Sequence, residues 1–149
     1  MIQDMKVAAL VPIKDHSERV QGKNFRNFCG KPLYHHVVHT LNNTYAVDDI
    51  LIDTDSPQVL NEAGNLSSKV RVIERPEDIR GDFVSMNRII EHDLKNSGAD
   101  IFLQTHATNP MISSETITRA LRKFVENMNE FDSLFSVTHH QARFYDKKG

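Results

Sequence analysis

The amino-acid sequence predicts an α/β fold with a mostly parallel sheet between two layers of helices. Two observations predict it. The apolar run 7–11 lacks polar alternation, which is typical of a strand that is buried on both faces. Further along the chain, short runs of β-type residues alternate with segments whose apolar residues recur at helical spacing. Such alternation indicates right-handed βαβ units, and hence a three-layer, Rossmann-like α/β/α arrangement.

The strands are predicted from short apolar runs bounded by polar residues. After the first strand, the second and third follow at 49–54 and 70–74. The fourth and fifth follow at 101–105 and 133–137.

The helices are predicted from their caps and apolar faces. Pro32 lies where a first helical residue is tolerated, and apolar residues then recur at helical spacing up to Leu41. A second helix is expected over 56–66. Ser85 and Ser114 are N-cap residues of two further helices. Their apolar faces are predicted to be Met86, Ile89, Ile90 and Leu94 in the first, and Ile117, Leu121, Phe124 and Val125 in the second.

Composition limits the class of protein. The chain has 149 residues, 39% of them hydrophobic, and a net charge of -2, which predicts one globular domain over 1–149. No apolar stretch approaches the about 20 residues of a membrane span, and the N-terminus lacks a signal-peptide pattern. The acidic balance argues against nucleic acid as a partner. The single cysteine, Cys29, excludes an internal disulfide framework and predicts a cytoplasmic location.

The loop that follows the first strand is the strongest functional signal. Residues 12–32 hold five Lys or Arg against two acidic residues. In a parallel sheet, ligands bind where such loops leave the carboxyl ends of the strands. Basic side chains and glycines there suit a polyphosphate, because they neutralise charge and allow backbone N–H groups to approach closely. The alternative is a solvated surface loop.

This loop matches neither common phosphate-binding motif, G-x-x-x-x-G-K-[ST] or G-x-G-x-x-G. Its Gly22-Lys23-Asn24 and Gly30-Lys31-Pro32-Leu33 elements resemble the glycosylation-precursor cytidylyltransferases, the family that includes CMP-N-acetylneuraminate synthetase. Where that family has Pro-Ala-Arg-Gly-Gly-Ser-Lys, residues 12–18 read Pro-Ile-Lys-Asp-His-Ser-Glu. Lys14 thus replaces an arginine, which keeps the charge but loses the planar fork.

Two later strand ends resemble the same family. Asp53-Thr54-Asp55-Ser56 stands for the family's Ser-Thr-Asp-Ser, and Asp55 or Ser56 either contacts a ligand or starts the next helix. Arg75-Pro76, followed by Asp82, stands for a segment that surrounds the cytosine and ribose. The resemblance implies that Arg75 donates hydrogen bonds to the base. The alternative for Arg75 is an ion pair at the strand end.

The fourth strand runs into a third matching segment. Alignment on Thr108-Asn109-Pro110 puts His106 at the position of a substrate-binding glutamine of the family. His106 is then a donor to a substrate oxygen, or alternatively makes a local structural hydrogen bond.

The resemblance implies the nucleotide-diphospho-sugar transferase type of fold and a cytidylyl transfer. The anomeric hydroxyl of a 2-keto sugar acid such as N-acetylneuraminate attacks the α-phosphate of CTP, and pyrophosphate leaves. Lys14 and Lys23 are the implied catalytic residues, and His106 and Thr108 the implied substrate-binding ones. The implied nucleotide-binding residues are Lys14, Ser17, Arg19, Gly22, Lys23, Asn24, Arg75 and Asp82. Mg²⁺ is the implied cofactor, with ligands in a segment of the family beyond residue 149.

Two other functions remain open from the sequence. One is a related nucleotidyltransferase, for example for 3-deoxy-manno-octulosonate, although Gly22-Lys23-Asn24 favours the sialic-acid branch. The other is a non-catalytic CTP-binding or assembly module, because the chain spans only the nucleotide-binding part of the family. The implied partners are CTP, a small acidic sugar and a second copy of the chain in a dimer.

Overall fold

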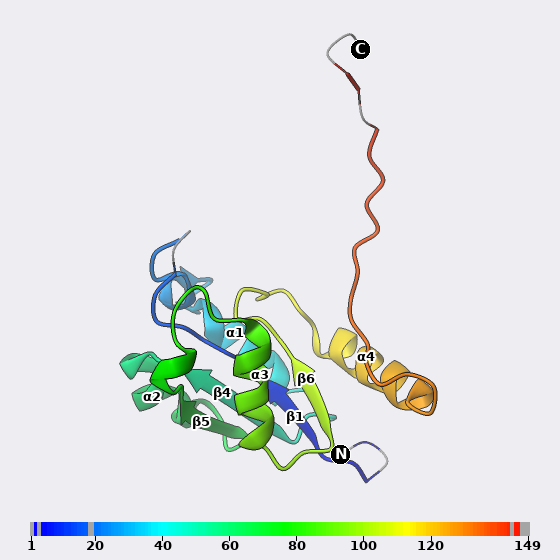
Figure 1. Cartoon of the computed structure of the whole chain (residues 1–149), viewed down its shortest axis with the longest axis horizontal. Coiled ribbons are helices and arrows are strands. Elements are labelled where there is room, and N and C mark those ends of the chain that lie inside the picture. The colour runs from blue at the N-terminus through cyan, green and yellow to red at the C-terminus, as the bar shows by residue number, and fades with distance from the viewer. Residues whose placement is uncertain (1, 3, 18–19, 144, 147–149) are drawn as a thin grey trace.

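The central sheet has four parallel strands in the order β5-β4-β1-β6 (Figure 1). The computed structural model describes residues 2, 4–17, 20–143 and 145–146. The strands are β1 (Val7–Leu10), β4 (Asp49–Thr54), β5 (Val70–Glu74) and β6 (Ile101–Gln104). In β1, Ala9 lies opposite Ile50 of β4 on one side and Leu103 of β6 on the other. The first four predicted strands are therefore confirmed, as is their parallel pairing.

Helices lie on both faces of this sheet. One face carries α1 (Leu33–Asn42), α2 (Pro57–Glu62) and α4 (Ser114–Asn127). There Val7 and Ala9 of β1 share a buried apolar cluster with Leu41, Val59 and Leu121. The opposite face carries α3 (Met86–Lys95), which Figure 1 shows crossing in front of the strands. The predicted three-layer α/β/α arrangement is thus confirmed.

The basic loop contains short elements that the sequence pattern does not predict. A 3-10 turn, η1 (Lys23–Phe25), is followed by a small antiparallel ribbon of β2 (Asn27–Phe28) and β3 (Lys31–Pro32). Pro32 is the last residue of β3 and also the N-cap residue of the next helix. It is therefore not the first helical residue, and α1 begins at Leu33. Two more 3-10 turns, η2 (Ala63–Leu66) and η3 (Glu77–Ile79), follow α2 and β5.

Two helix boundaries differ from the prediction. The helix expected over 56–66 stops at Glu62 and tightens into η2, where Gly64 weakens helix propagation. The cap of α4 is Ser113 and not Ser114: the Ser113 hydroxyl accepts a hydrogen bond from the Thr116 amide at 3.2 Å. The predicted cap Ser85 is confirmed, since it accepts from the Asn87 amide at 3.3 Å.

The fifth predicted strand, 133–137, is wrong. The structure shows no strand there, and the segment after α4 runs away from the body of the protein (Figure 1). Leu134, Phe135 and Val137 remain exposed. Side-chain alternation creates a preference for extended backbone, but a strand also needs a neighbouring backbone to bond with, and this segment pairs with no described strand.

The buried face of α3 also differs from the prediction. Ile89 is buried as expected, whereas Met86 and Leu94 are exposed. Asp93, a residue outside the predicted apolar face, is completely buried. Residue 93 follows the buried Ile89 by four positions, so it continues the inward stripe of this helix. Among the described residues, no helix is long and apolar enough to cross a membrane.

Candidate functional site

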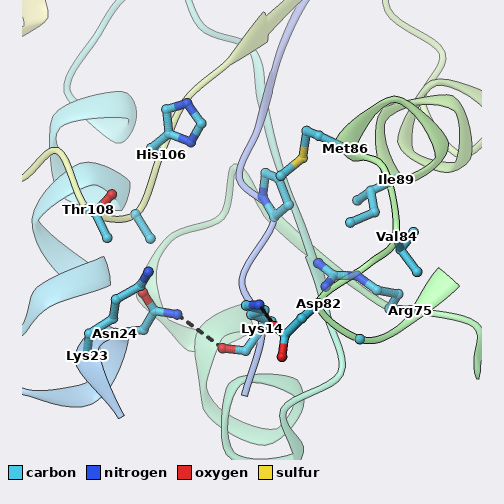
Figure 2. A pocket seen from close by; sticks show the side chains of 13 residues that line it. Lys14, Lys23, Asn24, Arg75, Asp82, Val84, Met86, Ile89, His106 and Thr108 are labelled. Atoms are coloured by element: carbon cyan, nitrogen blue, oxygen red, sulfur yellow. Dashed lines mark hydrogen bonds and ion pairs between the residues drawn. The ribbon is translucent and has the colours of Figure 1, made fainter. Parts of the chain in front are cut away.

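A pocket of about 270 Å³ lies at the carboxyl edge of the sheet (Figure 2). Lys14 reaches it from the loop after β1, Arg75 from the end of β5, and His106 from the loop after β6. Loops at the carboxyl ends of parallel strands converge at one edge, which explains how distant residues meet here. The predicted site residues that line the pocket are Lys14, Lys23, Asn24, Arg75, Asp82, His106 and Thr108.

Lys14 is fixed by contacts with three segments. Its ammonium group forms an ion pair with Asp82, which lies beside it in the pocket lining (Figure 2). Its carbonyl oxygen accepts a hydrogen bond from the Asn24 side chain at 3.1 Å. The preceding Ile13 donates its amide to the Asp53 carbonyl at 2.8 Å, which aligns the start of the loop with β4. The Lys14 charge is therefore held at the mouth of the pocket.

The Gly22-Lys23-Asn24 element forms the wall opposite Arg75. Gly22 has a φ of +60°, in the left-handed region that favours glycine, and it turns the chain into η1. Lys23 follows and has no ion-pair partner among the described residues. Asn24 is buried, and its Oδ1 atom has no hydrogen-bond partner within the described part of the chain. A buried, unsatisfied acceptor in a pocket wall is suited to a ligand hydroxyl.

Two predicted nucleotide-binding residues do not line the pocket, and a third lies outside the described residues. Ser17 is buried and does not line the pocket, and its hydroxyl is unpaired among the residues that the structure describes. Gly22 shapes the turn before Lys23 without lining the pocket. Arg19 lies outside the described residues.

Arg75 makes the ion pair that is one of its two predicted roles, and it also lines the pocket. It makes the strand-end ion pair, because its Nε donates to Asp53 Oδ1 at 2.5 Å. Its Nη2 also donates to the Asp53 carbonyl oxygen at 3.0 Å. The same side chain lines the pocket and points into it (Figure 2). Recognition of a base by Arg75 stays a prediction, and the geometry leaves it possible.

His106 and Thr108 lie across the pocket from Arg75 (Figure 2). The His106 carbonyl accepts from the Asn109 amide at 3.0 Å, which closes a turn after β6. Its imidazole ring is exposed and makes no hydrogen bond with any other described residue. The alternative of a structural hydrogen bond for this ring is thus not seen, and its role toward a substrate remains a prediction.

Asp55 and Ser56 have a structural role in this conformation. Asp55 accepts a hydrogen bond from the Asp15 amide at 2.8 Å, and the Ser56 hydroxyl donates to Asp15 Oδ1 at 2.7 Å. These bonds tie the first loop to the end of β4. Ser56 also occupies the N-cap position of α2, although its side chain makes no capping bond. Neither residue lines the pocket.

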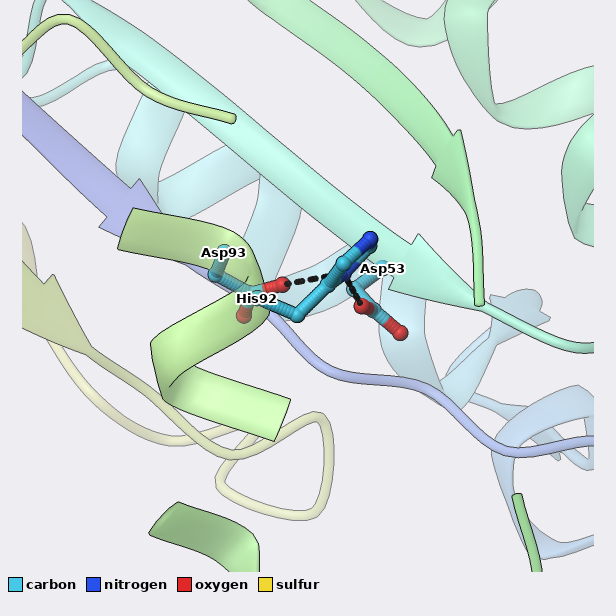
Figure 3. Close-up of side chains that lie close together, drawn as sticks. All are labelled: Asp53, His92 and Asp93. Carbon is cyan, nitrogen blue, oxygen red and sulfur yellow. Dashed lines mark hydrogen bonds and ion pairs between the residues drawn. The ribbon is translucent and has the colours of Figure 1, made fainter. Parts of the chain in front are cut away.

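A buried polar cluster behind Arg75 is absent from the sequence-based prediction (Figure 3). His92 Nδ1 lies 2.9 Å from Asp53 Oδ2, and Asp93 lies beside them on α3. Burial, together with the hydrogen bond and charge of neighbouring Asp53, raises the pKa of Asp93 to about 8. The signal that reveals this cluster is an acidic residue in the inward stripe of an amphipathic helix.

The cluster places three ligand atoms, from Asp53, His92 and Asp93, within 4.8 Å of one another, a spacing that a cation would accept. However, Arg75 and His92 already bind the two oxygens of Asp53. We therefore assign no metal ion to these residues.

The fold and the pocket together define an α/β protein with a pocket lined by basic side chains at the carboxyl edge of a parallel sheet. A family model described as cytidylyltransferase matches residues 8–149, and the chain belongs to this family.

Named relatives and solved structures agree with this assignment. The chain is 24% identical over 139 residues to the pseudaminic acid cytidylyltransferase of Campylobacter jejuni, covering 90% of this chain and 59% of that protein. It is 29% identical over 122 residues to the CMP-N,N'-diacetyllegionaminic acid synthase of Legionella pneumophila, covering 78% and 52%. A solved CMP:2-keto-3-deoxy-manno-octonic acid synthetase, complexed with CTP, has the same fold, with a TM-score of 0.68 and 22% identity over 83% of this chain and 48% of that one. The chain thus spans about half the length of the proteins it matches.

Proposed function

We propose that this chain binds CTP in the pocket and provides the nucleotide-binding part of a cytidylyltransferase. The acceptor would be a 2-keto sugar acid of the sialic-acid type, the product a CMP-sugar, and the leaving group pyrophosphate. The observation that carries the proposal is the meeting of Lys14 and Lys23 with Arg75 in one pocket at the carboxyl edge. Relatives named for pseudaminic and legionaminic acids support this class of acceptor.

Each wall of the pocket has a distinct task in this proposal. Lys14 and Lys23 neutralise the phosphates and the charge that develops on the departing pyrophosphate. Arg75 donates to the cytosine, while Asn24 Oδ1 accepts from a hydroxyl of the nucleotide. His106, on the opposite wall, donates to an oxygen of the sugar acid. Ser17 and Arg19 stay proposed nucleotide-binding residues, and Thr108 a proposed substrate-binding one.

Mg²⁺ is part of the proposal. Mg²⁺ is usually held by one or two carboxylates together with substrate phosphates and water, and it neutralises developing phosphate charge. Asp82 supplies a carboxylate to the pocket lining, so the pocket fits a metal that arrives with the nucleotide. Lys14, which pairs with Asp82, would hold that carboxylate in place.

A related acceptor is the second candidate. The chain is also 24% identical over 123 residues to the 3-deoxy-manno-octulosonate cytidylyltransferase of Geobacter sulfurreducens, covering 83% of this chain and 47% of that protein. Measurement of pyrophosphate release with N-acetylneuraminate and with 3-deoxy-manno-octulosonate as the acceptor separates the two candidate functions. If the chain binds CTP but releases no pyrophosphate with either acceptor, the result would instead indicate a non-catalytic binding module.

Selective binding of CTP is the first expected result. Calorimetric titration of the 149-residue chain with CTP, UTP, ATP and GTP, with Mg²⁺ present, should give saturable binding of CTP and at least tenfold weaker binding of the others. The reason is that the cationic walls bind any triphosphate, whereas Arg75 distinguishes the base. Equal affinity for all four nucleotides would reduce the site to a general anion pocket and contradict the proposal.

We also infer a cytoplasmic protein that self-associates and does not bind nucleic acid. Exposed Phe131, Leu134 and Phe135 lie on the segment after α4, and Leu134 borders an apolar hollow beside Phe102 of β6. Apolar surface of this kind favours association between copies. Light scattering at rising concentration should show a dimer, and Leu134→Ser should shift it toward monomer. A monomer at every concentration would contradict this inference.

A further inference from the structure

Asp53 binds one edge of the Arg75 guanidinium. The carboxylate accepts from Nε at 2.5 Å and the carbonyl oxygen of the same residue accepts from Nη2 at 3.0 Å. Both side chains are buried, with 3% of Arg75 and none of Asp53 exposed. The remaining nitrogen, Nη1, has no protein hydrogen-bond partner among the described residues. The guanidinium is therefore turned so that its unused donors face the pocket.

This pairing changes what Arg75 offers to a ligand. A buried carboxylate at 2.5 Å balances the guanidinium charge, so little net charge is directed into the pocket. What remains is an oriented N–H donor, which suits a neutral carbonyl or ring nitrogen better than a phosphate. Lys23, on the wall opposite Arg75, has no ion-pair partner among the described residues, whereas Lys14 lines the same pocket paired with Asp82. The pocket is thus divided into a base-reading region and a phosphate-binding region.

Helix α3 holds Asp53 in turn (Figure 3). His92 Nδ1 lies 2.9 Å from Asp53 Oδ2, the oxygen that Arg75 Nε does not use. Asp93, buried on the same helix, carries a raised pKa because of burial and the neighbouring Asp53 carboxylate, so at neutral pH it adds no second negative charge. Both oxygens of Asp53 are engaged, which leaves its carboxylate a single orientation.

We propose that Asp53 is a positioning residue, held by α3 through His92, that makes Arg75 a selective reader of the cytosine base. The inference rests on the proposed function, because it assumes that CTP occupies the pocket. It adds to that function Asp53, which fixes the orientation of Arg75, and α3, which holds Asp53 in place. Asp53 itself contacts no ligand in this scheme.

The test compares CTP with inorganic tripolyphosphate as a probe that lacks a base. Asp53→Asn should weaken CTP binding on the order of tenfold, the value of a lost charge-assisted hydrogen bond, and should narrow the preference for CTP over UTP. Tripolyphosphate binding should change by less than about threefold, because it depends on Lys14 and Lys23. Equal losses for both probes, or an unchanged affinity for CTP, would overturn the proposal.

His92 provides a second variant if Asp53→Asn fails to fold, because its side chain is partly exposed and its loss perturbs packing less. His92→Ala should weaken CTP binding without affecting tripolyphosphate, and His92→Asn should restore it, since an asparagine amide can donate from the position of Nδ1. Failure of His92→Ala to change CTP affinity would also contradict the scheme. A wild-type chain that does not prefer CTP would overturn the proposed function itself. If the wild-type chain prefers CTP and Asp53→Asn binds CTP with the same affinity and preference, only this inference is overturned.

Discussion

Replacement of Lys23 by alanine is expected to weaken CTP binding on the order of tenfold to a hundredfold, the range for a lost charge-assisted hydrogen bond to phosphate. Lys23 lines the pocket and has no ion-pair partner among the described residues, so its charge is available to a ligand. Calorimetric titration with CTP measures the loss. Pyrophosphate release, wherever the chain shows it, should fall by at least the same factor, because the same charge stabilises the leaving group.

Lys123→Ala is the matched control for this change. Lys123 is an exposed lysine on α4, away from the pocket, so its loss removes the same net charge without touching the site. Its affinity for CTP should stay within about twofold of wild type. A Lys23→Ala variant that binds CTP as tightly as Lys123→Ala would contradict the assignment of the Gly22-Lys23-Asn24 element to phosphate binding.

Asp93→Asn is expected to stabilise the protein at neutral and alkaline pH. Burial, with the added effect of Asp53, raises the pKa of Asp93 to about 8 in the fold, whereas an unfolded aspartate has a pKa near 3.9. Between these values the folded chain holds a proton that the unfolded chain has released. The Asp93 contribution to the free energy of unfolding therefore falls as pH rises from about 4 to 8. Asparagine keeps the shape and the donor without that dependence.

Urea unfolding at pH 5, 7 and 9 measures this effect. The difference between Asp93→Asn and wild type should grow with pH and reach a few kcal/mol, which is a large part of the stability of a domain of this size. Asp132→Asn, at an exposed aspartate, is the control and should follow the wild type at each pH. A variant that is less stable than wild type at pH 9 would mean that Asp93 is ionised and paired in the fold.

Local patterns were sufficient to locate most of the fold and much of the site. The strands 49–54 and 70–74 match the structure at both ends, because buried apolar runs between polar residues leave few alternatives. Most of the predicted site residues also meet in one pocket. They do so because each follows a parallel strand, and parallel strands bring their carboxyl ends to one edge.

Other predictions failed where a partner distant in the chain decides the outcome. The segment 133–137 has the side chains of a strand, but a strand requires a second backbone at hydrogen-bonding distance. Asp93 looks like a solvated residue in sequence, because the group that lies beside it in the fold, Asp53, stands forty positions earlier in the chain. From the sequence, base recognition and a strand-end ion pair are alternatives for Arg75. In the structure the contacts with Asp53 use Nε and Nη2, so the ion pair leaves Nη1 for a ligand.

The sequence by itself determined the class of fold, the basic loop after β1 and the cytidylyltransferase family, since these depend on residue order and local spacing. Only the tertiary structure decided that Arg75 is held by Asp53, that Asp93 and His92 lie beside this pair, and that Ser17 is buried without lining the pocket. The physical reason is that burial, charge pairing and the direction of a side chain are set by groups that come together only when the sheet and α3 pack. Periodicity specifies which face of an element turns inward, and packing specifies what that face meets there.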